Sequence, residues 1–419
     1  MSDHKPTTEP ALSRSAVVLT FDRLPLRLLG TYGSSLCQTP HLDRLAARGC
    51  VFDSHFAEDL NDSRTGHVWW SEEFPRKNSQ DARADGLAAR LRATGVKSTL
   101  VTDRPPASWS LAPSGFETIR AIESSDDSSH SSFAKLLIAA EEELELLIES
   151  DSPWLLWIHS SEMPEIPVPE MEFLELYLDE LTQLPPETDE DDPQDRPLPA
   201  ELRAEALEFI SQTLELLERE EAELELRHLR VLNVLASARM SELDHYLGGF
   251  FERIESLSHA RPGLLMLSSD VGLSLGEAAL TRQLEPSMTN CPLSEERIHV
   301  PLIVKTDELP FLQRCSALTQ HSDLPATLCD WFGLDAQHES NAGLSLLPMI
   351  RGVQESIRTQ GVSVAGDWRA IRDSNWLLIE NRDEGIERLY RQPEDRHQIL
   401  DVLPHYVEVA DRLGQQLRT

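Results

Sequence analysis

The run Ala16-Val17-Val18-Leu19-Thr20-Phe21 decides the fold, and Asp22 follows it directly. This apolar stretch is rich in β-branched residues and has no polar alternation, which is typical of a strand buried on both faces of a parallel sheet. Open α/β sheets gather ligands and catalytic groups at the carboxyl ends of their strands. Asp22 is therefore expected at the functional edge of such a sheet.

Two further stretches repeat this layout. Residues 263–269 form an apolar run that is followed by Asp270, and residues 154–158 form one that is followed by His159. Because the carboxyl ends of parallel strands meet at one edge of a sheet, these polar side chains are expected to share one crevice with Asp22.

Helical patterns lie between the predicted strands. Residues 39–48 and 86–94 have helical character, and each pattern stops at a glycine. Residues 241–256 carry apolar side chains at helical spacing. Strands that alternate with helices predict an α/β fold with a mostly parallel central sheet.

The composition changes between residues 139 and 226, where leucine and glutamate dominate. This pattern predicts an acidic helical insertion, and the proline-rich acidic stretch 185–199 is expected to form a disordered loop within it. The remaining chain divides into a large α/β domain over residues 1–350 and a small C-terminal subdomain over residues 351–419. We find no internal repeat.

The 419 residues include 72 acidic and 38 basic side chains, which gives a formal net charge of −34. Nucleic acid and anionic membrane surfaces would be repelled by this charge, so neither is expected as a partner. An unknown protein or small molecule is the expected partner. The five cysteines show no zinc or redox spacing. The polar N-terminal stretch and the lack of a long apolar run predict a cytoplasmic protein.

Several motifs at fixed offsets are similar to the opening of sulfatases. Residues 18–24 match the family's first strand and its metal-binding aspartate, residues 29–33 match its Leu-Gly-x-Tyr-Gly turn, and residues 39–46 match its helix start. The stretches 298–304, 322–334 and 343–348 agree in order with later family motifs. The chain thus resembles the sulfatase branch of the alkaline-phosphatase-like superfamily, which implies that fold with a small antiparallel C-terminal subdomain.

The resemblance implies metal-dependent hydrolysis of sulfate esters by a formylglycine, which the family makes from the Cys or Ser of a C/S-x-P-x-R motif. In this register Leu60 occupies the nucleophile position, Asp62 replaces the proline and Arg64 matches the arginine. Leucine has no heteroatom and cannot attack sulfur. A shift of three residues would offer Ser63, but without an arginine at the required spacing.

The family's metal site is also reduced. Asp22 and Asp270 match two metal-binding aspartates, whereas Arg23 and Val271 replace two further ligands. Two carboxylates are few for a calcium or magnesium ion, so Asp22 and Asp270 are expected to form at most a weak remnant of that site. A buried ion pair between Arg23 and one of the aspartates is our hypothesis for how the crevice stays neutral. Capping of loop amides by the two aspartates is an equal alternative to weak metal binding.

The family's acid and base positions are substituted as well. Its lysines and histidines are replaced at four matching positions, by Asp103, Pro105, Pro164 and Asn290. Histidines elsewhere near the crevice could build a different site, namely His55, His67 and His159, although lone histidines more often have structural roles. The pair Trp69-Trp70 is expected to pack in the core, with an exposed aromatic contact as the alternative.

These losses favour a catalytically impaired member of the family, a pseudoenzyme with a binding or interaction role. The alternative is an active sulfuric ester hydrolase, or a related ester hydrolase, that uses a non-standard site with Asp22, Asp270 and Arg64 as surviving groups.

Overall fold

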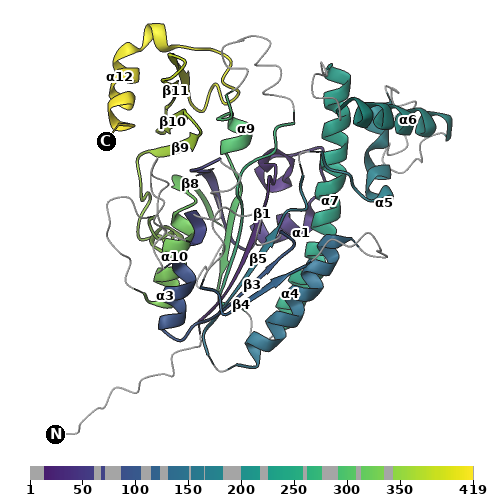
Figure 1. Cartoon of the computed structure of the whole chain (residues 1–419), viewed down its shortest axis with the longest axis vertical. Coiled ribbons are helices and arrows are strands. Elements are labelled where there is room, and N and C mark those ends of the chain that lie inside the picture. Colours follow the sequence, from purple (N-terminus) through teal and green to yellow (C-terminus); the bar gives the residue numbers. More distant parts are fainter. Residues whose placement is uncertain are drawn as a thin grey trace.

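The computed structural model describes residues 14–60, 68–70, 86–104, 115–122, 131–150, 152–164, 166–182, 200–217, 225–257, 262–275, 291–307, 313–334 and 343–418. These residues form a central sheet with helices on both faces and a smaller sheet beside it (Figure 1). The central sheet has eight strands in the order β4-β3-β5-β1-β6-β7-β2-β8. Its strands are β1 (Ser15–Phe21), β2 (Cys50–Phe56), β3 (Lys97–Thr102), β4 (Thr118–Ala121), β5 (Trp154–Ser160), β6 (Leu264–Ser269), β7 (Leu302–Thr306) and β8 (Gln313–Gln320).

The middle of this sheet consists of the three strands that the sequence pattern singled out. β1 lies between β5 and β6 and runs parallel to both, with Phe21 opposite Ser160 on one side and Ser269 on the other. β7 is antiparallel to its two neighbours, β6 and β2. The predicted α/β class with a mostly parallel sheet is therefore confirmed.

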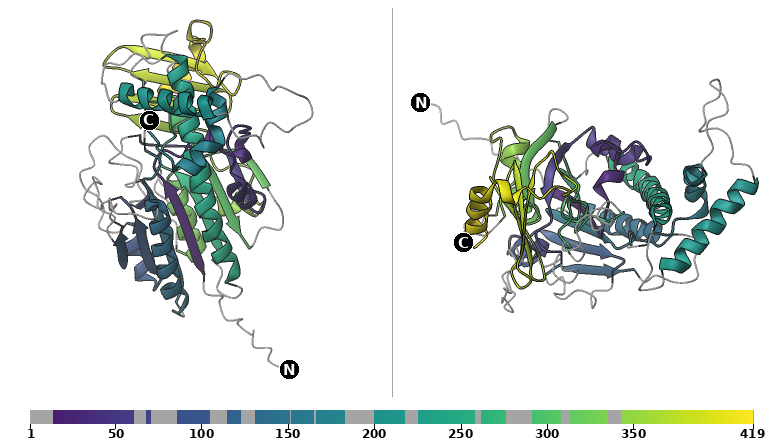
Figure 2. Two further views of the ribbon diagram at one scale, coloured as in Figure 1. Left: turned by 90° about the vertical axis from the view of Figure 1, so that its right-hand side faces the viewer. Right: turned by 90° about the horizontal axis from the view of Figure 1, so that it is seen from above.

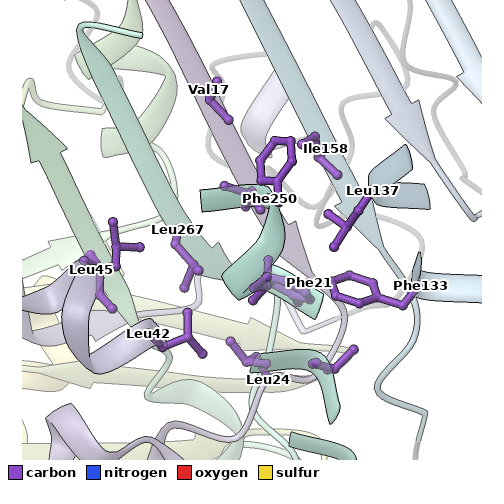
Figure 3. Close-up of a cluster of buried hydrophobic side chains, with 14 of the residues drawn as sticks. Val17, Phe21, Leu24, Leu42, Leu45, Phe133, Leu137, Ile158, Phe250 and Leu267 are labelled. Atoms are coloured by element: carbon purple, nitrogen blue, oxygen red, sulfur yellow. The ribbon is translucent and has the colours of Figure 1, made fainter. Parts of the chain in front are cut away.

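Two hydrophobic layers explain why the β1 sequence lacks polar alternation. Val17, Leu19 and Phe21 face one layer (Figure 3), whereas Ala16 and Val18 face the other. The first layer includes α1 (Pro40–Ala46), α4 (Ser132–Ile148) and α7 (Leu226–Ser256), and the second includes α3 (Leu87–Ala93), α10 (Asp323–Phe332) and α11 (Leu347–Ile350). A strand covered on both sides needs apolar residues at every position.

The acidic segment 139–226 is not one separate unit. Its first residues belong to α4, and Trp154–Ser160 form β5 at the centre of the sheet. The elements that stand apart from the sheet are α5 (Met171–Leu174), η4 (Glu175–Leu181) and α6 (Ala200–Leu217), which pack on the first half of α7. The insertion is thus narrower than predicted, because buried leucines within residues 139–160 build the core of the sheet domain. The predicted loop 185–199 lies outside the described residues.

The C-terminal part forms an antiparallel sheet in the order β12-β11-β10-β9. Its elements are β9 (Gly361–Ala365), β10 (Trp368–Arg372), β11 (Trp376–Asn381), β12 (Ile386–Arg391), η7 (Leu403–His405) and α12 (Val407–Gln416). α12 covers one face through Ala410 and Leu413. The other face packs on the central domain, and this sheet and α6 lie on opposite sides of the molecule (Figure 2).

Three short helices complete the connections that matter for the site: η1 (Leu26–Leu28), η2 (Gly30–Tyr32) and α9 (Glu295–Ile298). Among the described residues, none of the helices is both long and apolar enough to cross a membrane.

Candidate functional site

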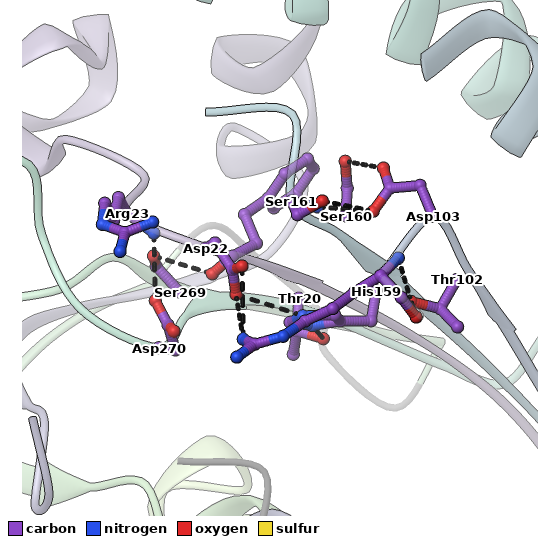
Figure 4. Close-up of polar contacts among 12 residues, drawn as sticks. Thr20, Asp22, Arg23, Thr102, Asp103, His159, Ser160, Ser161, Ser269 and Asp270 are labelled. Atoms are coloured by element: carbon purple, nitrogen blue, oxygen red, sulfur yellow. Dashed lines mark hydrogen bonds and ion pairs between the residues drawn. The ribbon is translucent and has the colours of Figure 1, made fainter. Parts of the chain in front are cut away.

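The strand ends of β1, β5 and β6 bring Asp22, His159 and Asp270 together (Figure 4). Main-chain bonds fix this edge, because the Asp22 N–H donates to the carbonyl of Ser160 at 2.8 Å and the Asp270 N–H donates to that of Phe21 at 2.9 Å. The three side chains are almost fully buried. The edge is therefore a packed cluster of charged and polar groups.

Asp22 is paired with two nitrogen-bearing side chains. Arg104, which lies just after β3, places Nη1 3.3 Å from both carboxylate oxygens, and Nε2 of His159 lies 3.1 Å from Oδ1. Burial raises the pKa of Asp22, but the His159 imidazole and then the Arg104 guanidinium outweigh it and lower the pKa to about 2. Asp22 is thus ionised at neutral pH and can only accept hydrogen bonds.

Asp270 has the opposite character. Its Oδ1 accepts the main-chain N–H of Arg23 at 2.9 Å and that of Val271. Burial, followed by the negative charge of Asp22, raises the pKa of Asp270 well above its usual range. The two carboxyl groups therefore divide their roles, with Asp22 ionised and Asp270 favouring its protonated form.

A divalent metal ion does not fit this arrangement. The Arg104 guanidinium lies against both oxygens of Asp22, and Asp270 already accepts two main-chain hydrogen bonds. Val271 has no ligand atom. Within the described residues, no group of three or more His, Cys, Asp or Glu side chains could hold a metal ion. Calcium and magnesium prefer six or more oxygen ligands, so the cationic partner of Asp22 is the protein's own arginine.

The identity of that arginine corrects our hypothesis about Arg23. Arg23 contacts Asp270 through its main-chain N–H and has a left-handed backbone with φ of 58°, whereas the guanidinium at Asp22 comes from Arg104. Arg104 was not among the residues predicted from the sequence, because the family's lysine and histidine positions match its two neighbours, Asp103 and Pro105. Its place directly after β3, at the same edge as Asp22, was the signal that could have found it.

Leu60 lies in a different environment, at the contact with the C-terminal sheet. Its N–H donates to the carbonyl of Val364 in β9 at 2.9 Å, and Val364 N–H donates back to the carbonyl of Glu58 at 2.8 Å. The Leu60 side chain is 5% exposed and belongs to the buried cluster of Phe56, Val271, Ile298, Trp368, Leu377 and Ile379. The residue that the resemblance matches to the family nucleophile is thus part of a hydrophobic core. Arg64, Ser63 and Asp62 lie outside the described residues.

Asp103 has taken a structural role at the position of a family lysine. Its carboxylate accepts Ser160 Oγ at 2.8 Å, Ser161 N at 2.6 Å and Ser161 Oγ at 2.9 Å, and it thereby holds the loop after β5 (Figure 4). Burial raises the pKa of Asp103. Pro164, at the position of a family histidine, is exposed, and Pro105 and Asn290 lie outside the described residues.

The other candidate side chains do not join the Asp22 cluster. His55 is fully buried beside His321, and its Nδ1 lies 3.0 Å from Thr319 Oγ1. Burial and then the nearby His321 lower the pKa of His55 well below its usual value, which favours a neutral structural histidine. Trp69 and Trp70 are buried, as expected for core residues. His67 lies outside the described residues.

Solved structures that are similar to this chain include phosphonate monoester hydrolases and sulfatases. The chain is similar to the phosphonate monoester hydrolase of Agrobacterium radiobacter, with TM-score 0.73, 17% identity, and coverage of 96% of this chain and 94% of the other. It is also similar to an enzyme solved with its substrate D-glucosamine-2-N,6-O-disulfate, with TM-score 0.70, 16% identity and 97% coverage of each chain. The TM-scores show a common fold, and at identities of 16% and 17% the likeness shows the fold alone.

The family assignment comes from the sequence. No curated protein sequence is significantly similar to this one. The family model for sulfatases, however, matches residues 15–334, well over half of the chain, including β1, the Asp22 and Asp270 strand ends and α10. Together with the fold, this match shows that the chain belongs to the sulfatase family.

Proposed function

We propose that this chain is a non-catalytic sulfatase-family protein that acts by binding a partner. The observation that carries the proposal is the burial of Leu60 at the nucleophile position. Transfer of a sulfuryl or phosphoryl group to the protein requires an oxygen, sulfur or nitrogen nucleophile that the substrate can reach. An aliphatic side chain in a packed core provides neither the atom nor the access.

The charge arrangement at Asp22 supports the same conclusion. In this family a metal ion withdraws charge from the ester and helps to activate the nucleophile. Here the Arg104 guanidinium lies 3.3 Å from Asp22, and Asp270 Oδ1 accepts two main-chain hydrogen bonds, so both carboxyl groups already have partners within the chain. Arg104 satisfies the buried charge without supplying Lewis-acid chemistry.

A hydroxyl, an imidazole and a carboxylate do line up in this cluster, which bears on the enzyme alternative. Thr20 Oγ1 lies 3.0 Å from His159 Nδ1, and His159 Nε2 lies 3.1 Å from Asp22 Oδ1. This order matches that of hydrolases with an activated hydroxyl. The Thr20 hydroxyl, however, is in the middle of the sheet, 1% exposed, and already accepts the Trp157 Nε1–H at 2.9 Å. The arrangement therefore supports strand packing better than ester cleavage.

The charge of the chain narrows the class of partner. A net charge of −34 disfavours nucleic acid and anionic membranes and leaves proteins and small molecules.

A hydrolysis assay tests the proposal. Purified protein is incubated with an aryl sulfate, an aryl phosphate and a phosphonate monoester, with and without calcium or magnesium, and compared with the Asp22→Asn variant. We expect no turnover above that of the variant. Turnover by the parent chain that Asp22→Asn removes would overturn the proposal and establish the enzyme alternative.

A further inference from the structure

A second concave region lies away from the strand-end cluster, between the central domain and the C-terminal sheet. We call it the junction cleft. It has a volume of about 820 Å³ and is bordered by β2, β8, α9, η1 and the turns of the C-terminal sheet. Small-molecule sites commonly have this size and often lie between two structural units. Asp22, Asp270 and Leu60 do not line it.

The charge of the junction cleft differs from that of the chain. Among the described residues, its lining contains five arginines and four acidic residues, namely Arg27, Arg314, Arg358, Arg372 and Arg396 with Asp53, Glu295, Glu296 and Asp373. The balance of these residues is one positive charge, in a protein whose net charge is −34. These side chains therefore attract an anion, whereas the chain as a whole repels it.

Ion pairs account for each of the four acidic residues. Arg314 pairs with Asp53, Arg372 with Glu295, Arg27 with Glu296 at 3.9 Å, and Asp373 with Arg412 from outside the cleft at 3.1 Å. Arg358 pairs with Asp323, which is not part of the lining.

Arg396 remains as the surplus charge. It is exposed, and its Nε donates to His397 Nε2 at 3.1 Å. Over the described part of the chain no carboxylate forms an ion pair with it. With Nε held by a neighbouring imidazole, the terminal nitrogens of this guanidinium remain available to an incoming acid group.

Hydroxyl groups complete the junction cleft. Ser316, Thr359 and Ser374 line it and are exposed, so they can donate hydrogen bonds to a ligand or accept them. Phe56 also lines the cleft, but it is buried, and His299 and the Arg372 guanidinium already contact its ring, at centroid distances of 4.7 and 3.9 Å. One cation and several hydroxyls together suit a small, hydroxylated molecule with a single acid group.

We propose that the junction cleft binds a small hydroxylated carboxylic acid, such as a sugar acid, with its carboxylate on Arg396. A guanidinium and a carboxylate form a charge-assisted, often bidentate pair. One surplus positive charge matches one carboxylate, whereas a dianion would bring an uncompensated charge to an acidic protein. This acid would be the partner that the proposed non-catalytic protein binds. The proposal does not depend on whether the Asp22 cluster is inactive.

Calorimetric titration with D-glucuronate tests this inference, with D-glucose as the uncharged probe and D-glucose 6-phosphate as the dianionic one. We expect saturable binding of glucuronate, none of glucose, and weaker binding of the phosphate. Arg396→Gln should weaken glucuronate binding at least about tenfold, because it removes the charge-assisted pair. The matched control is Arg391→Gln, since Arg391 is also exposed but lies outside the cleft lining, and it should leave the affinity unchanged.

Three results would overturn the inference. The first is that glucuronate does not bind, and the second is that Arg396→Gln and Arg391→Gln lose the same amount of affinity for it. The third is that Asp22→Asn loses glucuronate binding, which would place the ligand at the strand ends. Because Arg396 is exposed, its variant should fold like the parent chain, and equal thermal midpoints would confirm that. Failure of this test leaves the hydrolysis result unaffected, so the two proposals fail separately.

Discussion

Two regions that the family resemblance matches to the catalytic site differ in character. The nucleophile half is the segment of residues 58–60 beside β9, where Leu60 lies in a hydrophobic core. The carboxylate half is the cluster of Asp22, Asp270, Arg104 and His159, in which the Arg104 guanidinium lies against the Asp22 carboxylate. An aliphatic side chain such as that of Leu60 needs only apolar neighbours, whereas a buried carboxylate needs a positive partner.

The largest test of this contrast is Leu60→Ser, which restores an oxygen at the nucleophile position. It leaves a cavity and a buried hydroxyl, so we expect the free energy of unfolding to fall by about 4 kcal/mol, measured by urea denaturation. We expect no gain of hydrolysis. Leu60→Met is the volume-conserving control and should cost less than about 1.5 kcal/mol. A serine variant as stable as the parent would show that Leu60 is not a core residue.

Arg104→Gln tests the carboxylate half. Once the guanidinium is removed, His159 is the remaining nitrogen-bearing side chain paired with Asp22 in the described part of the chain. We therefore expect the free energy of unfolding to fall by about 3 kcal/mol and the pKa of Asp22 to rise. Millimolar calcium or magnesium should then raise the thermal midpoint of the variant but not that of the parent. Arg23→Gln is the control, because the Arg23 contact with Asp270 uses the main chain. Equal behaviour of both variants would refute the role assigned to Arg104.

Glu58 makes the stability of the nucleophile half dependent on pH. Its carboxyl group accepts Ser322 N at 2.8 Å and Ser322 Oγ at 2.9 Å, and burial, opposed by Arg358, raises its pKa from 4.5 to about 7. A raised pKa in the folded state stabilises the fold fully below the unfolded value of 4.5, and this contribution is lost as the pH rises through about 7.

Glu58→Gln removes this titration. Between acidic and mildly alkaline pH, we expect the free energy of unfolding to decline by roughly 3 kcal/mol less in the variant than in the parent. Urea denaturation across that range measures the difference. Glu384→Gln, a change of an exposed residue in the C-terminal sheet, should leave the parent slope intact. Identical slopes in the parent and Glu58→Gln would contradict the raised pKa.

The smallest expected effect separates the two carboxyl groups. Asp270→Asn replaces a group that already favours its neutral form, and the amide oxygen can accept the same main-chain hydrogen bonds. The free energy of unfolding should therefore fall by less than about 1 kcal/mol. Asp22→Asn removes the charge that Arg104 and His159 share and should cost more. If Asp270→Asn is the more damaging change at neutral pH, the assignment of the charge to Asp22 is wrong.

The strands and helices near the site were predictable because they depend on local pattern. The apolar runs before Asp22, His159 and Asp270 predicted three buried strands whose ends share one crevice, and the structure has them as the neighbouring strands β1, β5 and β6. The extent of the insertion was not predictable in the same way. Leucine and glutamate at helical spacing describe both α4, which covers the sheet, and α6, which lies outside it, and only packing separates the two.

The sequence by itself determined that Asp22 and Asp270 follow buried strands, since residue type and local periodicity predict them. The match of Leu60 to the family nucleophile came from the resemblance and stays a prediction. Only the tertiary structure decided that Arg104 is the partner of Asp22, that Leu60 packs against the C-terminal sheet, and that Arg396 faces the junction cleft. The physical reason is the separation along the sequence between the residues that interact. Strand patterns are recorded in neighbouring residues, whereas the partner of a charge or a methyl group depends on which distant segments the fold places beside it.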